Sequence, residues 1–277
     1  MLLGYNTNGF VSHALVDALR VIARVGYKSV GLTLDHHALN PFGGNWEAES
    51  DRCAALLREL GLTPVVETGA RYLLDPWRKH QPTFLSDDEA DRQRRIGFLQ
   101  RAVDTATRIG AGVISLWSGA APVGATPDAL DTRLVQGLRT VCDYAALRGV
   151  VIGFEPEPGM YISGMSEFDW LSEKVGHPAF QLTLDVGHAH ITEEAGAAET
   201  VKRYARRIVN VHLEGMNRAA HDHLVPWEGD MDVAAVLRAL RDTAYAGPAT
   251  FELSRHSHVA VDTARKVFQF VSDALVG

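Results

Sequence analysis

The sequence predicts an α/β chain that folds as a single (β/α)8 TIM barrel over residues 1–277. Three observations support this fold class. Short apolar runs typical of strands alternate with amphipathic helical segments from one end of the chain to the other. There are eight of each, so 277 residues give about 35 residues a unit, which suits a closed barrel better than an open doubly wound sheet. A glycine also marks several joints between a helix and the next strand.

The predicted strands are short and almost continuously apolar, as expected for a parallel sheet that is covered on both faces. In the run Val150–Glu155, for example, only the last residue is charged. In chain order, the predicted strands are Leu2–Asn6, Ser29–Leu34, Thr63–Glu67, Gly112–Trp117, Val150–Glu155, Phe180–Asp185, Ile208–Leu213 and Ala249–Leu253.

Each predicted strand is followed by a segment with the apolar periodicity of a helix. In the first segment, Leu15, Leu19 and Ile22 recur at the spacing of one buried helical face. The predicted helices cover 13–25, 47–60, 88–109, 127–148, 166–175, 193–206, 232–242 and 259–275. Four of the helices end at a glycine, which accepts the left-handed backbone that closes a helix, namely Gly26, Gly61, Gly110 and Gly149.

Composition and charge restrict the possible partners. With 46% hydrophobic and 22% charged residues, the chain can bury a core, which excludes a disordered protein. The formal charge of −7 offers no basic stripe for nucleic acid, and no apolar stretch approaches the roughly 20 residues of a membrane span. The first residues do not resemble a signal peptide, and Cys53 and Cys142 lie in helical patterns. We therefore expect a cytoplasmic protein with reduced thiols, for which a homo-oligomer is compatible with the sequence.

The connections differ in length on the two faces of the predicted barrel. Long segments follow the second, third and seventh strands, at 35–46, 68–87 and 214–231, whereas each helix is joined to the next strand by a few residues. Active sites of this fold are built by the loops at the carboxyl ends of the strands. The sequence therefore predicts an active site on that face.

Ionisable residues follow several of the apolar strands. Glu155, Asp185, His212 and Glu252 each stand at or just after a strand end, so all four are expected at one mouth of the barrel. Three carboxylates and one imidazole form a mainly oxygen-rich ligand set, which suits one divalent ion such as Mn²⁺, Mg²⁺ or Co²⁺ and less clearly Zn²⁺. The sequence predicts a metal site formed by these residues.

The motifs around these residues resemble those of the xylose isomerase-like TIM barrel superfamily, which includes sugar isomerases and epimerases, ketose 3-epimerases, inosose dehydratases and endonuclease IV. The resemblance spans the chain and rests on Phe154-Glu155-Pro156, Leu184-Asp185-Val186-Gly187-His188, Val211-His212-Leu213 and Phe251-Glu252-Leu253. The segment His223–Asp232 also resembles the H-x-x-P-G-E-G-x-x-D loop of the family, with Trp227 in place of a glycine.

The resemblance implies roles by position. Glu155 and Glu252 match glutamates that bind the metal and exchange protons with the substrate carbon, whereas Asp185 and His212 match residues that only bind the metal. Two further residues match substrate-binding residues: His188 matches a histidine, and Arg218 an arginine that holds substrate oxygens near the metal. Such a site would stabilise an enediolate formed when a carbon-bound proton leaves, with one carboxylate on each face of the substrate.

Other polar residues near the predicted mouth have more than one interpretation. Glu67 is predicted to contact substrate hydroxyls, and a role as ligand of a second metal ion is the alternative. Trp117 either stacks on a sugar or packs at the rim. His223 is predicted to bind substrate, although His221 and His223, with Asp222 between them, can instead recruit a further metal ion.

The function predicted from these features is a metal-dependent isomerase or epimerase acting on a sugar, ketose or cyclitol. A dehydratase of the inosose or dehydroshikimate type is the closest alternative, because it uses the same enediolate. A multi-zinc phosphodiesterase like endonuclease IV and a non-catalytic binding protein are less favoured. The loops after the seventh and eighth strands lack a glycine-rich anion nest, which favours an unphosphorylated substrate.

Overall fold

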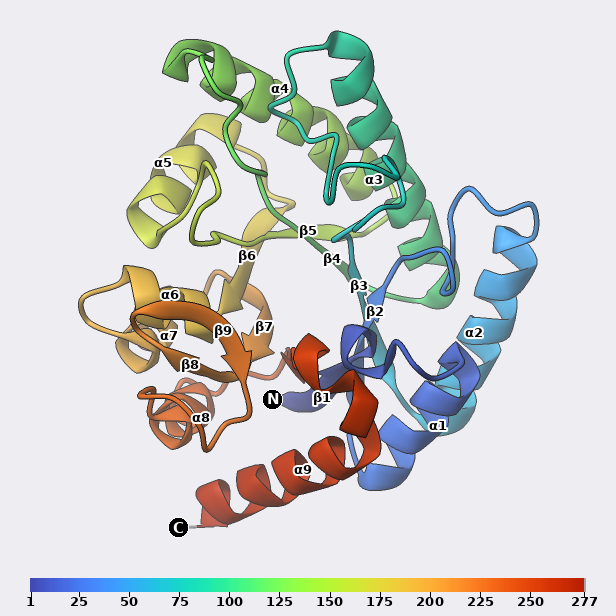
Figure 1. Ribbon diagram of the computed structural model, residues 1–277, viewed down its shortest axis with the longest axis vertical. Coiled ribbons are helices and arrows are strands. Elements are labelled where there is room, and N and C mark those ends of the chain that lie inside the picture. Colours follow the sequence, from blue (N-terminus) through green and yellow to red (C-terminus); the bar gives the residue numbers. More distant parts are fainter. Residues whose placement is uncertain (277) are drawn as a thin grey trace.

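The computed structural model describes residues 1–276 and shows the predicted barrel (Figure 1). Eight parallel strands close in the order β1-β10-β7-β6-β5-β4-β3-β2. The barrel strands are β1 (Leu2–Asn6), β2 (Ser29–Thr33), β3 (Thr63–Glu67), β4 (Val113–Leu116), β5 (Val151–Phe154), β6 (Phe180–Asp185), β7 (Ile208–Leu213) and β10 (Pro248–Phe251). Each of them overlaps a strand predicted from the sequence, so the fold class is confirmed.

Helices follow the strands and surround the barrel (Figure 1). They are α1 (Leu15–Val25), α2 (Trp46–Leu60), α3 (Glu89–Ile109), α4 (Pro127–Ala146), α5 (Met165–Val175), α6 (Val186–Thr192), α7 (Ala197–Tyr204), α8 (Val233–Asp242) and α9 (Ala260–Val276). Two short 3-10 helices, η1 (Thr7–Phe10) and η2 (Ser254–Val259), follow the first and last barrel strands. Within the described residues, none of these helices is long and apolar enough to cross a membrane.

The segment after β6 differs from the predicted helix 193–206. Here the chain forms α6 directly after the strand and then α7, which begins only at Ala197. The Asp185 carboxylate caps α6 by accepting a hydrogen bond from the His188 amide at 2.8 Å. Gly196, with φ +77, then separates the two helices. The prediction was wrong because a short capped helix of seven residues gives too little apolar periodicity to be recognised.

The long segment after β7 contains a hairpin that the sequence did not predict. Its antiparallel strands are β8 (Gly215–Asn217) and β9 (Ala220–Leu224). Gly215 and Gly229 allow the surrounding loop to pack closely, because a Cβ on Gly229 would lie 2.4 Å from the Met216 carbonyl oxygen. The hairpin lies beside α6 at the mouth of the barrel (Figure 1).

The apolar residues of the strands and of the inner helix faces form the core. Phe154, Phe168 and Phe180 stack between β5, β6 and α5, with ring centroids 5.4 to 6.4 Å apart. Cys53 and Cys142 lie buried in α2 and α4 as free thiols, as predicted. The register of the strands determines which residues meet at the mouth of the barrel. Asp185 of β6 pairs with His212 of β7, and His212 pairs with Thr250 of β10.

Candidate metal and substrate site

The four residues predicted to bind a metal lie together at the mouth of the barrel. Glu155 follows β5, Asp185 ends β6, His212 lies in β7 and Glu252 follows β10. One side-chain ligand atom from each of the four lies within 4.8 Å of every other. We call these four residues the quartet. Neighbouring parallel strands therefore bring together residues that are almost 100 positions apart in the sequence.

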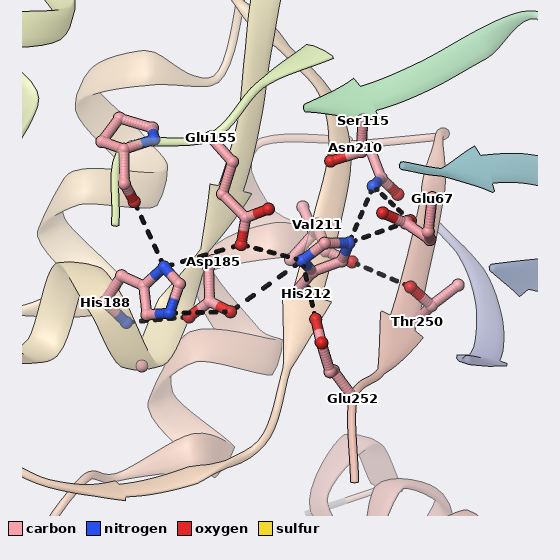
Figure 2. A network of polar contacts seen from close by, with 12 residues as sticks. Glu67, Ser115, Glu155, Asp185, His188, Asn210, Val211, His212, Thr250 and Glu252 are labelled. Atoms are coloured by element: carbon pink, nitrogen blue, oxygen red, sulfur yellow. Dashed lines mark hydrogen bonds and ion pairs between the residues drawn. The ribbon is translucent and has the colours of Figure 1, made fainter. Parts of the chain in front are cut away.

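His212 occupies the centre of the quartet (Figure 2). Its Nδ1 lies 3.2 Å from Glu155 Oε1, 3.1 Å from Glu252 Oε2 and 3.9 Å from Asp185 Oδ2. Burial by itself acts to lower the pKa of His212, but the surrounding carboxylates, Glu67 among them, outweigh it and raise the pKa well above its ordinary value. The imidazole is thus held in a strongly negative environment.

The chemistry of the quartet fits a divalent cation. The Asp185 side chain is fully buried, and its Oδ2 accepts no hydrogen bond within the described residues. Burial raises the pKa of Asp185 well above its ordinary value, and burial also raises the pKa of Glu155. Buried carboxylates without a counter-charge are costly, and a bound cation would supply that charge. The quartet provides three carboxylates and one imidazole for such an ion.

One neighbouring carboxylate fixes the orientation of the His212 ring. Its Nε2 lies 3.0 Å from Glu67 Oε1 and 3.2 Å from the Asn210 amide nitrogen. Figure 2 shows these partners on the side of the ring away from the quartet carboxylates. A proton on Nε2 that is donated to Glu67 leaves Nδ1 free to bind a metal, as in carboxylate–histidine–metal arrangements. The sequence predicted that Glu67 contacts substrate hydroxyls, and it gave no indication of the contact between Glu67 and His212.

Glu252 is held by a residue from the opposite end of the chain. The Asn8 side-chain amide, on η1 after β1, donates a hydrogen bond to Glu252 Oε1 at 2.8 Å. The other carboxylate oxygen faces His212. The hydrogen bond thus fixes the direction in which this carboxylate presents its free oxygen.

A fifth carboxylate, Glu214, lies directly behind the quartet. Its side chain is fully buried, accepts a hydrogen bond from the Gly187 amide at 2.8 Å and pairs with His223 Nδ1 at 3.3 Å. Although burial acts against both shifts, this pairing lowers the pKa of Glu214 to about 2 and raises that of His223 to about 9. Gly187 is required here, because a Cβ would lie 2.4 Å from Glu214 Oε1. The signal for Glu214 was its position directly after β7, where an ionisable residue follows an apolar strand.

Three histidines form a second group of ligand atoms beside the quartet. His188, His221 and His223 each offer one ring nitrogen, and these atoms lie within 4.8 Å of one another. His188 Nε2 lies 2.9 Å from His221 Nε2, and His188 Nδ1 lies 3.2 Å from the Pro156 carbonyl oxygen. Burial lowers the pKa of His188 well below its ordinary value, so its ring is neutral at neutral pH. The structure thus brings His188 and His223 to the cavity, and their roles in substrate binding stay predictions.

The quartet opens into a cavity of about 660 Å³, a volume that suits a small-molecule ligand. Trp117 forms part of its wall, together with His80, whose ring is edge-on to the indole at a centroid distance of 5.4 Å. Behind the indole lies the Arg95 guanidinium, 4.6 Å from the ring centroid. Trp117 is therefore fixed by packing on the side away from the cavity.

The cavity wall also includes Glu157, which the sequence did not indicate. Burial, followed by the charges of Glu155 and Glu252, raises the pKa of Glu157 to about 8. Arg71, Lys79 and Arg255 supply the cations of the wall. Their positions depend on how long loops fold, for which the sequence gives no periodic signal.

Arg218 lies away from the cavity in this structure. Its Nη1 donates to the Glu193 carbonyl oxygen at 3.3 Å, and its backbone amide donates to Asp230 at 3.0 Å. It is not among the described residues that line the cavity. The hairpin directs the side chain toward the end of α6, so the role of Arg218 in holding substrate oxygens stays a prediction.

Comparison with known proteins places this chain in a family. A family model described as xylose isomerase-like TIM barrel matches residues 19–273. The L-ribulose 3-epimerase of Methylomonas sp. (strain DH-1) is 27% identical over 245 residues, which are 85% of this chain and 77% of that protein. The L-ribulose-5-phosphate 3-epimerase of Salmonella typhi is 22% identical over 239 residues, 86% of this chain and 81% of that protein.

A similar fold is found among solved structures. The IolI protein with a bound zinc atom aligns with a TM-score of 0.78 at 17% identity, covering 100% of this chain and 97% of that chain. At this identity the likeness concerns the fold alone. Because the family model extends over most of the sequence, the chain belongs to the xylose isomerase-like TIM barrel family.

Proposed function

We propose that this protein is a divalent-metal-dependent ketose 3-epimerase, with Glu155 and Glu252 as the acid/base pair. The observation that carries the proposal is the approach of these two carboxylates to His212 Nδ1 from two sides, at 3.2 and 3.1 Å (Figure 2). A substrate lying at the quartet would have one carboxylate near each face. The sugar 3-epimerases among the curated relatives support the same reaction class.

Epimerisation requires that a proton leave a carbon on one face and return on the other. One of the two glutamates removes the proton next to the carbonyl, and the other donates a proton to the opposite face. Burial raises the pKa of Glu155, which strengthens it as a base toward a weakly acidic carbon. Asn8 keeps Glu252 oriented throughout by its hydrogen bond to Oε1.

The quartet residues Glu155, Asp185, His212 and Glu252 would hold the metal ion, Mn²⁺, Mg²⁺ or Co²⁺ by ligand type, with Zn²⁺ as the alternative. When bound, such an ion supplies positive charge that stabilises the oxyanion developing on the substrate. Neutral His188 donates its Nδ1 proton to the Pro156 carbonyl oxygen, so we propose that its Nε2 accepts a hydrogen bond from a substrate hydroxyl and that Trp117 contacts the sugar face. The remaining residues that we propose to bind the substrate are His223, Glu67 and Arg218. Glu67 also orients His212, one of the proposed metal ligands.

A dehydratase acting through the same proton removal is the second candidate. The observation that favours it is Glu157, a further carboxyl on the cavity wall besides Glu155 and Glu252. If Glu157 protonates a β-hydroxyl as it leaves, the carbanion eliminates water instead of being reprotonated. The two reactions share the first step and differ only in the product.

The experiment that tests the proposal is proton exchange in D₂O. The metal-loaded protein is incubated with a panel of ketoses and inososes, and proton NMR follows both deuterium uptake and product formation. We expect deuterium at C3 of at least one ketose, together with its 3-epimer. An unsaturated product would establish the dehydratase instead. Absence of exchange from every ketose and inosose, with metal bound, would contradict the proposal.

Metal content distinguishes the proposed epimerase from the remaining candidate, a multi-zinc phosphodiesterase. The three histidines beside the quartet provide ligand atoms for a further ion, as a multi-zinc phosphodiesterase would require. Elemental analysis of the purified protein is expected to give about one divalent ion per chain. Three zinc ions per chain, with cleavage of an abasic-site DNA duplex, would favour the phosphodiesterase and exclude the epimerase.

A further inference from the structure

The quartet and a group of cations stand on different parts of the cavity wall. The quartet belongs to β5, β6, β7 and β10, whereas Arg71, Lys79 and His80 belong to the loop after β3. In the closed strand order, β3 lies across the barrel from β7, which carries His212. A ligand that reaches across the mouth therefore has the quartet at one end and this loop at the other.

Two cations on this loop, Arg71 and Lys79, have no carboxylate partner within residues 1–276. Arg71 and Lys79 line the cavity, and neither forms an ion pair with a described residue. Other cations near the mouth do: Arg255 pairs with Asp222 at 2.6 Å, and Arg78 pairs with Asp75 at 2.6 Å. The two unpaired cations are thus the ones that face the ligand space from this loop.

A buried cation adds to the positive charge of this side. Arg95 is 1% exposed, its Nη1 has no hydrogen-bond partner, and its Nη2 donates only to the Thr68 carbonyl oxygen at 3.2 Å. Burial lowers the pKa of His80, and Lys79, Arg95 and Arg71 lower it further by their charge. All three cations thus act on the same ring, and an anion bound near His80 would be attracted by their charge.

We propose that the substrate carries a terminal anionic group, a phosphate monoester or a carboxylate, that binds Arg71 and Lys79 while its carbonyl end lies at the quartet. The inference rests on the proposed ketose epimerase for the carbonyl end. The loops after β7 and β10, where the sequence suggested no anion site, take no part in it. Instead, the loop after β3 provides the positive charge, in the same cavity into which the quartet opens.

The first test is binding of ligands that cannot react. A pentitol, the corresponding pentitol 5-phosphate and the corresponding pentonate lack a ketone, so calorimetry on the Mn²⁺-loaded protein measures affinity without turnover. We expect at least one anionic ligand to bind about tenfold more tightly than the neutral pentitol, because charged hydrogen bonds contribute strongly. Comparison of the phosphate with the carboxylate identifies which anion the site prefers.

The variants Arg71→Gln, Lys79→Gln and the double variant locate the effect. Each single change should reduce the preference for the anion severalfold, and the double change should abolish it while leaving pentitol affinity unchanged. Arg78→Gln is the matched control, since Arg78 neighbours Lys79 but pairs with Asp75. Unchanged pentitol binding in each variant shows that the cavity is still folded. Equal affinity for neutral and anionic ligands, or a preference that survives the double change, overturns the proposal.

A second measurement separates this inference from the proposed function. Deuterium exchange is followed for a ketopentose and its 5-phosphate, and we expect kcat/KM to be at least about tenfold higher for the phosphate or for the matching keto acid. If ketoses exchange but charge brings no advantage in binding or exchange, the anion site is wrong and the epimerase stands. If the anion preference is present and no ketose exchanges, the epimerase is wrong and the anion site stands.

Discussion

Glu155, Asp185, His212 and Glu252 stand at the ends of four strands, whereas Arg71, Lys79 and His223 reach the same cavity from a long loop and a hairpin. The strand-end residues are fixed by the register of the barrel and converge on one nitrogen. The loop residues depend on the course of segments that vary in length. The comparison indicates that the strands set the reaction and the loops set the substrate.

The largest expected effect is on the strand-end side. Glu155→Gln and Glu252→Gln should each lower the rate of deuterium exchange by roughly 10²–10⁴-fold, because each removes one member of the proton-exchanging pair. The rate is measured by NMR at saturating metal. Glu228→Gln, an exposed glutamate on the loop after β9, is the control and should keep full activity. Normal exchange in either quartet variant would show that the strand ends do not set the reaction.

A smaller effect is expected for the residue that orients His212. Glu67→Gln should weaken metal binding roughly 10–100-fold, because Glu67 accepts the Nε2 proton of His212 and so fixes the nitrogen that faces the quartet. Competition with a chromophoric chelator measures this affinity. Exchange at saturating metal should be restored in large part. A loss of exchange with unchanged metal affinity would instead assign Glu67 to the substrate.

On the hairpin side, the His223–Glu214 pair should stabilise the fold in a defined pH range. The pKa of Glu214 is lowered to about 2, so its contribution is present above its usual pKa of 4.5 and is lost as pH falls toward 2. The pKa of His223 is raised to about 9, so its contribution is present below 6.5 and is lost as pH rises through 9. The full stabilisation therefore lies between pH 4.5 and 6.5.

The corresponding variant is His223→Asn in metal-free protein. At about pH 5.5 it should lower the stability by about 3 kcal/mol, since it leaves a buried carboxylate unpaired, and so lower Tm by several degrees. Near pH 10 the difference from the unmodified chain should be much smaller. Thermal denaturation followed by circular dichroism measures both. His258→Asn, a change at an exposed histidine, is the control, and a Tm difference for His223→Asn that is independent of pH would contradict the pairing.

The smallest effect is expected at the cavity wall. Trp117→Leu should raise KM about fivefold with little change in kcat, because the aromatic wall contributes to binding and lies apart from the proton-exchanging pair. Steady-state kinetics on the substrate identified by exchange give both constants. Trp117→Phe, which keeps an aromatic ring against Arg95, should retain most of the affinity. An equal fall in kcat and kcat/KM would show that Trp117 contributes to the reaction itself, as the strand-end residues are proposed to do.

The strands and the quartet were predictable because both follow from periodic patterns and from the geometry of parallel strands. The hairpin β8–β9 was missed because it carries His221, Asp222 and His223 in place of alternating apolar residues. Helix α6 was missed because its seven residues are too few to show an apolar periodicity. The cations Arg71 and Lys79 gave no signal, since a loop residue faces a cavity only by virtue of the folded path.

The hydrogen bond from Asn8 to Glu252 lies at the seam where β1 and β10 close the barrel. Asn8, which is translated before Glu252, therefore holds a proposed catalytic group that joins the chain much later. While the chain is being synthesised, Glu155, Asp185 and His212 emerge before their partner, and the seam stays open until the segment through Glu252 has left the ribosome. The site is consequently assembled in a single late step, so a growing chain has no proton-exchanging pair until its barrel is closed.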